Sequence, residues 1–138
     1  MGKKNALKIE DDIYKVLVDV FPGIIGGTLY KEGTRPLDAS TEDAVIIVSG
    51  GDTEQVQTVR AHINIYVPDV DNGSGNLVED KTRLAELSDY DETIVETLNN
   101  VLFEEYSFRL NKITDTFAEP DINQHFVNVN LEFERITF

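Results

Sequence analysis

The sequence has no cysteine and no tryptophan, and it has few basic residues. Without cysteine the fold is not held by disulfides, and the composition does not indicate a redox compartment. No apolar run approaches the roughly 20 residues that a membrane-spanning helix needs. The N-terminus also has no apolar signal region. We therefore expect no association with a membrane.

Positive charge is scarce. The chain has 26 Asp and Glu residues against 12 Lys and Arg residues, which gives a formal net charge of −14. A chain of this charge is repelled by nucleic acid phosphates and by anionic membranes. The basic residues also do not cluster, apart from Lys3, Lys4 and Lys8 near the start. Sequence-specific binding of nucleic acid is therefore not expected.

The length and composition of the chain suffice for one packed domain. The 138 residues are 41% hydrophobic and 28% charged, as expected of a chain with an apolar core and a charged surface. No internal repeat, low-complexity tract or linker divides the sequence. We therefore expect a single domain over residues 1–138.

Two segments have the apolar spacing of amphipathic helices. Residues 5–20 repeat apolar side chains three and four positions apart, and Phe21-Pro22-Gly23 ends the pattern. Residues 81–103 form a second apolar arc that includes Leu84, Leu87, Ile94 and Leu98. Asp91 projects near the middle of that second arc, where a carboxylate is not expected.

Most of the remaining chain has strand patterns. Ala44 to Val48 is a short apolar run rich in β-branched residues, which predicts a central strand with both faces covered. Apolar and polar residues alternate from Val59 to Val67 and from Val127 to Phe133, which predicts two long strands. Shorter strands are predicted at residues 26–30 and 106–113, and loops at residues 69–80 and 114–124.

The predicted fold class is α+β, with one mostly antiparallel β-sheet and two α-helices packed on one face. The other face of the sheet would be polar without being strongly charged. Such a face meets either water or a neighbouring subunit. It would carry His62, Asn64, Tyr66, Asn128, Asn130 and Glu132.

Residues 69–80 are similar to a calcium-binding loop, in which oxygen ligands alternate and a bidentate acid comes last. Counted from Asp69, Gly73 falls at the fifth position, where a side-chain oxygen is expected, and Ser74 falls where the sharp turn needs glycine. Asp80, at the last position, is short for a bidentate ligand. The pattern favours a solvated loop. A soluble acidic binding module of unknown partner, calcium-dependent through residues 69–80, is the alternative function.

Other chemistry has little support in the sequence. His62 and His125 have no neighbouring His or Cys to complete a zinc site. The glycines of residues 23–28 lack the Lys-Ser/Thr ending of a phosphate-binding loop. A small enzyme that uses Asp91 or His62 in a cleft is a third hypothesis. We expect no catalytic residue, no metal and no cofactor.

The order of elements resembles the tail-terminator, or tail-completion, proteins of long-tailed bacteriophages and prophages. These are small α+β subunits with a leading helix, a run of strands, a helix and closing strands. The resemblance covers nearly the full length and is one of element order. The segments that carry it are residues 30–36, 42–47, 61–69 and 127–131.

The resemblance implies a structural role without enzyme activity. Subunits of this family form rings, typically hexamers, at the head-proximal end of the tail tube, where they stop tube polymerisation and join the tube to the head. The implied partners are copies of the chain itself, tail-tube proteins and head-connector proteins. The implied location is the virion tail, assembled in the cytoplasm of a bacterial host. An acidic lumen would let DNA pass without sticking, and Asp69, Asp71, Glu79 and Asp80 are the candidate lumen or partner residues.

Overall fold

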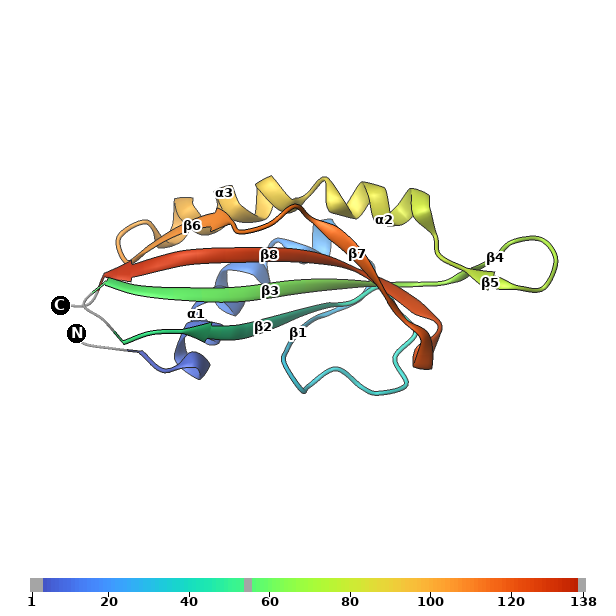
Figure 1. The fold of residues 1–138 in the computed structure, drawn as a ribbon, viewed down its shortest axis with the longest axis horizontal. Helices are drawn as coiled ribbons and strands as arrows, with labels where there is room; N and C mark the ends of the chain where they lie inside the picture. Colours follow the sequence, from blue (N-terminus) through green and yellow to red (C-terminus); the bar gives the residue numbers. More distant parts are fainter. Residues whose placement is uncertain (1–3, 54–55, 137–138) are drawn as a thin grey trace.

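A computed structural model of the chain describes residues 4–53 and 56–136. Its main feature is a six-stranded sheet in the order β1-β2-β3-β8-β6, in which β7 also pairs with β8 (Figure 1). The pair β1–β2 is parallel and the other pairs are antiparallel, so the predicted α+β class with a mostly antiparallel sheet is confirmed. The strands are β1 (Leu29–Lys31), β2 (Ala44–Gly51), β3 (Val56–Pro68), β6 (Tyr106–Leu110), β7 (Asp115–Glu119) and β8 (Gln124–Ile136).

The centre of the sheet is the pair formed by β3 and β8. These strands run antiparallel in register from Val56 opposite Ile136 to Pro68 opposite Gln124. Because side chains alternate between the two faces of a strand, this register places one apolar set on a common face. That set is almost fully buried and consists of Val59, Ala61, Ile63, Ile65, Val67, Val127, Val129, Leu131 and Phe133.

The helices pack on this apolar face, as predicted. Helix α1 (Ala6–Leu17) begins after Asn5, whose side chain accepts a hydrogen bond from the Lys8 backbone N–H. A short 3-10 turn, η1 (Phe21–Gly23), follows it. Helices α2 (Lys81–Ser88) and α3 (Asp91–Leu102) add buried side chains to the same core. Within residues 4–53 and 56–136, no helix has the length and apolar character to cross a membrane.

The second helix predicted over residues 81–103 is present, but it is bent and interrupted at Asp89 and Tyr90, where α2 ends and α3 begins. This break explains the position of Asp91. Its carboxylate lies in the first turn of α3, where negative charge is favourable, and accepts hydrogen bonds from the Glu92 N–H at 2.7 Å and the Thr114 hydroxyl at 2.7 Å. Asp91 therefore does not intrude into the apolar core.

Three other expectations need correction. Residues 69–80 contain two short paired strands, β4 (Val70–Asp71) and β5 (Leu77–Val78), in place of a loop. Residues 114–124 contain β7 and a 3-10 turn, η2 (Pro120–Ile122). Strand β2 is an internal strand between β1 and β3, but the predicted burial of both faces holds only for Ala44, Val45 and Ile46, because β1 pairs only with these residues and Ile47 and Val48 are half-buried.

A buried aspartate organises the connection between β1 and β2. Asp43 is 1% exposed and accepts hydrogen bonds from the Thr28 backbone N–H at 2.8 Å, the Thr41 hydroxyl at 2.8 Å and the Arg35 Nε at 3.0 Å. Gly27 lies against this turn. A Cβ added at Gly27 would lie 2.2 Å from the Glu42 carbonyl oxygen and 2.2 Å from Asp43 Oδ1. The close approach of the two backbones therefore requires glycine at this position.

We expect Gly27→Ala to lower the free energy of unfolding by about 1–3 kcal/mol, because the added methyl group would displace backbone atoms. Urea unfolding followed by circular dichroism measures this change. Gly26→Ala is the matched control, since a Cβ at Gly26 meets nothing within 4 Å. Equal stability of the two variants would contradict the expectation.

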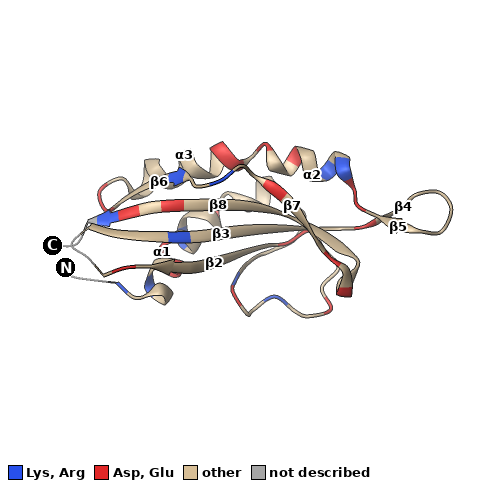
Figure 2. Ribbon diagram, viewed as in Figure 1, with Lys and Arg blue, Asp and Glu red and all other residues tan. Residues whose placement is uncertain are grey.

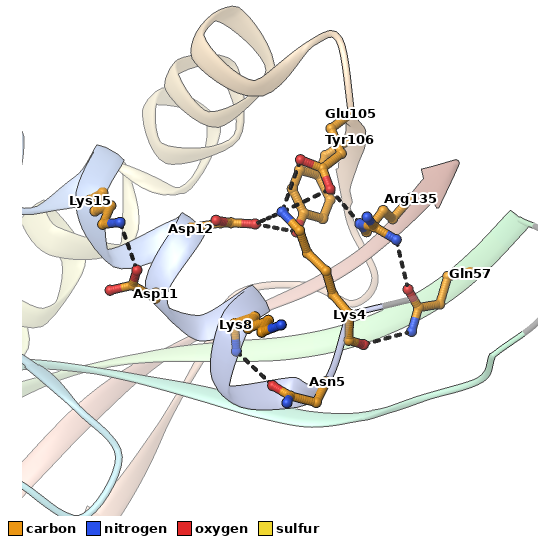
Figure 3. Close-up of polar contacts among 10 residues, drawn as sticks. All are labelled: Lys4, Asn5, Lys8, Asp11, Asp12, Lys15, Gln57, Glu105, Tyr106 and Arg135. Atoms are coloured by element: carbon orange, nitrogen blue, oxygen red, sulfur yellow. Dashed lines mark hydrogen bonds and ion pairs between the residues drawn. The ribbon is translucent and has the colours of Figure 1, made fainter. Parts of the chain in front are cut away.

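A polar network ties the start of the chain to its last strand (Figure 3). The Lys4 ammonium donates to Asp12 at 2.6 Å and to Glu105 at 3.0 Å, and the Tyr106 hydroxyl donates to Asp12 at 2.6 Å. The buried Arg135 donates from Nε to Glu105. Burial lowers the pKa of Lys4, but its hydrogen bonds to Asp12 and Glu105 outweigh this, and the net pKa is raised. Burial, and then the bond to Asp12, raise the pKa of Tyr106.

Replacing Glu105 with Ala should destabilise the protein by about 1–3 kcal/mol, because it removes a carboxylate partner from both Lys4 and the buried Arg135. Glu104→Ala removes the same charge from the neighbouring exposed position and should change stability by less than about 0.5 kcal/mol. Thermal unfolding of both variants at neutral pH tests the difference. A Glu105→Ala midpoint equal to that of Glu104→Ala would show that the network does not stabilise the fold.

Candidate functional site

The chain leaves the sheet at Pro68 and forms a projecting hairpin, which we call the arm (residues 69–80). Strands β4 and β5 pair Val70 with Val78 and Asp71 with Leu77. The turn between them uses Gly73 and Gly75 at positive φ of 95° and 88°, conformations that favour glycine. The arm extends beyond the end of the main sheet along the long axis of the molecule (Figure 1). It is therefore a ribbon that stands apart from the packed core.

Two of the four predicted site residues accept hydrogen bonds from backbone N–H groups close to them in sequence. Asp71 Oδ1 accepts hydrogen bonds from the N–H groups of Gly73 at 2.7 Å and Gly75 at 3.2 Å, which closes the turn of the arm. Asp80 is the N-cap of α2, and its Oδ1 accepts from the Arg83 N–H at 3.1 Å. The side chain of Asp71 is exposed.

The other two predicted site residues meet at the base of the arm. Asp69 Oδ1 lies 2.7 Å from His125 Nδ1, and Glu79 Oε2 lies 3.8 Å from His125 Nε2. Glu79 also lies 3.6 Å from the Lys81 ammonium. The Asp69 side chain is only 10% exposed. The imidazole between two carboxylates joins both ends of the arm to β8, so this cluster fixes where the arm emerges.

The arm carries apolar side chains that the rest of the chain does not cover. Val70 is 42% exposed, Leu77 52% and Val78 39%. Val70 and Val78 lie opposite each other and share one face of the ribbon, while Leu77 lies with Asp71 on the other face. The candidate partner residues predicted in this segment were only its carboxylates, Asp69, Asp71, Glu79 and Asp80. The three apolar residues within an otherwise polar stretch were the signal that could have added apolar contacts to this prediction.

The polar face of the sheet, which we call the open face, lies opposite the helices and carries a ladder of amide side chains. Asn128 Nδ2 donates to Asn64 Oδ1 at 2.8 Å and lies 3.2 Å from His62 Nδ1. Asn130 Nδ2 lies 3.3 Å from the same His62 nitrogen, and Asn111 Nδ2 donates to Asn130 Oδ1 at 3.1 Å. Of the polar side chains predicted for this face, four therefore contact one another, namely His62, Asn64, Asn128 and Asn130. They form a neutral floor with hydrogen-bonding groups.

A hollow of about 540 Å³ lies over this ladder, and we call it the groove. Its floor includes His62 and the amide side chains, and its sides include Lys112, Ile113 and Phe117. Ile113 is 87% exposed and Phe117 is 50% exposed, so two large apolar side chains rise beside a polar floor. Neither residue was predicted as a candidate, because Ile113 was expected in a strand and Phe117 in a loop. In the structure β6 ends at Leu110 and Phe117 lies in β7, and only the tertiary fold brings both residues to the open face.

The Tyr66 end of the open face is covered by an arginine. The Arg35 guanidinium lies 4.3 Å from the centre of the Tyr66 ring and donates to Gln124 Oε1 at 3.0 Å. Burial, followed by the charge of Glu119, raises the pKa of Tyr66, whereas Arg35 acts in the opposite direction. A second hollow of about 530 Å³ lies beside this pair and includes Glu32, Glu119 and Asp121. The two hollows thus differ in charge, and the one near Tyr66 is the more acidic.

The few basic residues mostly lie beside acids (Figure 2). Arg60 and Arg109 both contact Glu132, at 3.1 Å and 2.5 Å, and Arg83 contacts Glu42 at 2.6 Å. Lys31 and Lys15 flank Asp11 at 2.9 Å and 2.8 Å, and their hydrogen bonds lower the pKa of Asp11 to about 2. Most of the basic side chains named here therefore form ion pairs with acids of the same chain.

The residues considered for metal binding or catalysis do not converge. His62 belongs to the open face, whereas His125 pairs with Val67 on the helix-covered face. Asp91 belongs to α3 on that same covered face. Within the part of the chain that the structure describes, no group of three or more His, Cys, Asp or Glu residues is placed to hold a metal ion.

Comparisons with known proteins do not assign a family. No protein-family model matches the sequence, and no curated protein matches it. One solved structure, whose name states no function, matches over 99% of this chain and 99% of its own length, at 13% sequence identity and a TM-score of 0.43. A likeness of this degree carries no argument about function.

We expect calcium at 1 mM to leave the unfolding temperature unchanged, because Asp69, Asp71 and Asp80 already accept hydrogen bonds or pair with His125 and are not arranged around one point. Calorimetric titration with calcium, with magnesium as the matched control, should show no heat of binding. A calcium-specific heat would instead support the calcium-dependent binding module.

Proposed function

We propose that this protein is a structural subunit of a bacteriophage or prophage tail, which assembles into a ring that ends the tail tube and joins it to the head. The observation that carries the proposal is the arm, a two-stranded ribbon outside the packed core with Val70, Leu77 and Val78 exposed. Isolated two-stranded hairpins are marginally stable in water and gain from packing against other surfaces. An assembling subunit offers such a surface.

The open face supports the same proposal. It joins apolar side chains, Ile113 and Phe117, to a floor of neutral hydrogen-bonding groups. Interfaces between subunits commonly combine an apolar centre with polar groups of this kind. The chain therefore has two separate surfaces that fit contacts with other proteins, and the resemblance to tail-terminator proteins supplies the kind of assembly.

The charge of the chain is compatible with passage of DNA. A ring of subunits that each carry a net charge of −14 repels the phosphate backbone. Of the four candidate lumen residues, Asp71 is the one with an exposed side chain, whereas Asp69 and Asp80 are engaged at the base of the arm and at the start of α2. Asp71 is therefore the strongest of these candidates for contact with a lumen or a partner.

In solution we expect assemblies larger than one chain, and for a hexamer a mass six times the 15.5 kDa of one chain. Native mass spectrometry and light scattering over a range of protein concentrations measure this mass, and negative-stain electron microscopy shows whether the assemblies are rings. Genes for head and tail-tube proteins beside the gene for this chain would be independent support. A monomer at every concentration would contradict the proposal.

A further inference from the structure

The apolar side chains of the arm are exposed, and no other part of the described chain packs on them. Both faces of the ribbon carry exposed apolar side chains, with Val70 and Val78 on one face and Leu77 on the other. The arm also points away from the body, so it does not lie over the open face of its own chain (Figure 1). A cover must therefore come from another molecule.

The groove matches the arm in chemistry. Ile113 and Phe117 offer apolar contact area at its side, and the amide ladder on its floor can exchange hydrogen bonds with an incoming backbone. A ribbon such as the arm has unpaired backbone groups along its outer edges. The groove therefore suits a peptide segment that offers both apolar side chains and unpaired backbone N–H and C=O groups, in preference to a charged ligand.

Charge complementarity favours the groove over the hollow near Tyr66 as the binding site for the arm. Within residues 4–53 and 56–136, Lys112 forms no ion pair, and it is the one basic side chain of the groove. The arm brings the exposed carboxylate of Asp71. The groove also has one acid, Asp115, which accepts a hydrogen bond from the Thr116 N–H at 2.8 Å and keeps its charge, so the groove has no net charge. The hollow near Tyr66 has three acids against one base, Arg35, so its net charge is negative and would repel the arm.

We propose that the groove on the open face receives the arm of a second copy of this chain, with Leu77 against Ile113 and Phe117 and with Asp71 facing Lys112. The contact joins two different surfaces, the arm of one copy and the groove of another. Each copy can therefore bind one neighbour through its arm and a second neighbour through its groove. Repetition of such a head-to-tail contact closes a ring if its rotation allows. This inference rests on the proposed assembly and names the interface that would build it.

Cross-linking tests the contact directly, because the natural chain has no cysteine. A mixture of the single variants Leu77→Cys and Ile113→Cys should form an intermolecular disulfide under mild oxidation. A mixture of Leu77→Cys and Phe103→Cys is the matched control, since Phe103 is 70% exposed at the end of α3 and away from the groove. Equal cross-linking in the two mixtures would overturn the inference.

A charge exchange tests the pairing of Asp71 with Lys112. Lys112→Glu and Asp71→Lys should each weaken assembly by roughly 10-fold, and the double variant should recover most of that loss. Asp71→Lys also removes the hydrogen bonds of the arm's turn, so recovery in the double variant is the decisive result. Lys8→Glu is a control with the same change of charge on an exposed side chain of α1. No recovery in the double variant would contradict the pairing.

Mixing tests the head-to-tail arrangement. Leu77→Asp removes the arm contact and Ile113→Asp removes the groove contact, so each variant alone should be a monomer. Their mixture retains one intact arm and one intact groove, and it should form dimers that do not grow further. Assembly of the wild-type chain without the specific cross-link, or larger assemblies in the mixture, would overturn the arm–groove contact and leave the proposed function standing. A strictly monomeric wild-type chain would overturn both.

Discussion

The paired strands β3 and β8 support the rest of the molecule. Their register runs without interruption from Val56 opposite Ile136 to Pro68 opposite Gln124. Since side chains alternate along a strand, this one register decides which residues face the helices and which form the open face. A shift by one residue would exchange the apolar set for the amide ladder. The helices, the groove and the outer strands all depend on this pairing.

The same pairing decides where the arm emerges. Pro68 has no backbone N–H to extend the sheet, and the chain continues past it as a separate ribbon. His125 on β8 then holds Asp69 and Glu79 at the two ends of that ribbon. The direction of the arm is therefore coupled to the long strand pair. A rigid sheet with an arm held at its end is a geometry that suits a subunit whose contacts must repeat.

Charge has two different roles in this chain. Buried or half-buried acids organise the fold, as Asp43 does between β1 and β2 and Glu105 does between Lys4 and β8. Basic residues are used mainly as their partners, so the excess of acid remains on the surface. A surface of that kind disfavours nucleic acid and anionic membranes. In the proposed assembly, apolar contact and isolated cations such as Lys112 would therefore join the copies.

The fold class, the helix-covered face and the polar face could be predicted from the sequence, because apolar periods of two and of three to four residues indicate which side of an element is buried. The sequence did not show the break before Asp91, the strands of the arm or β7, since short elements have little periodicity and depend on distant partners. The candidate carboxylates were visible as residue types, but their roles were not. Only the tertiary structure paired Asp69 with His125 and placed Ile113 and Phe117 beside the amide ladder, because these neighbours come from segments far apart in the chain.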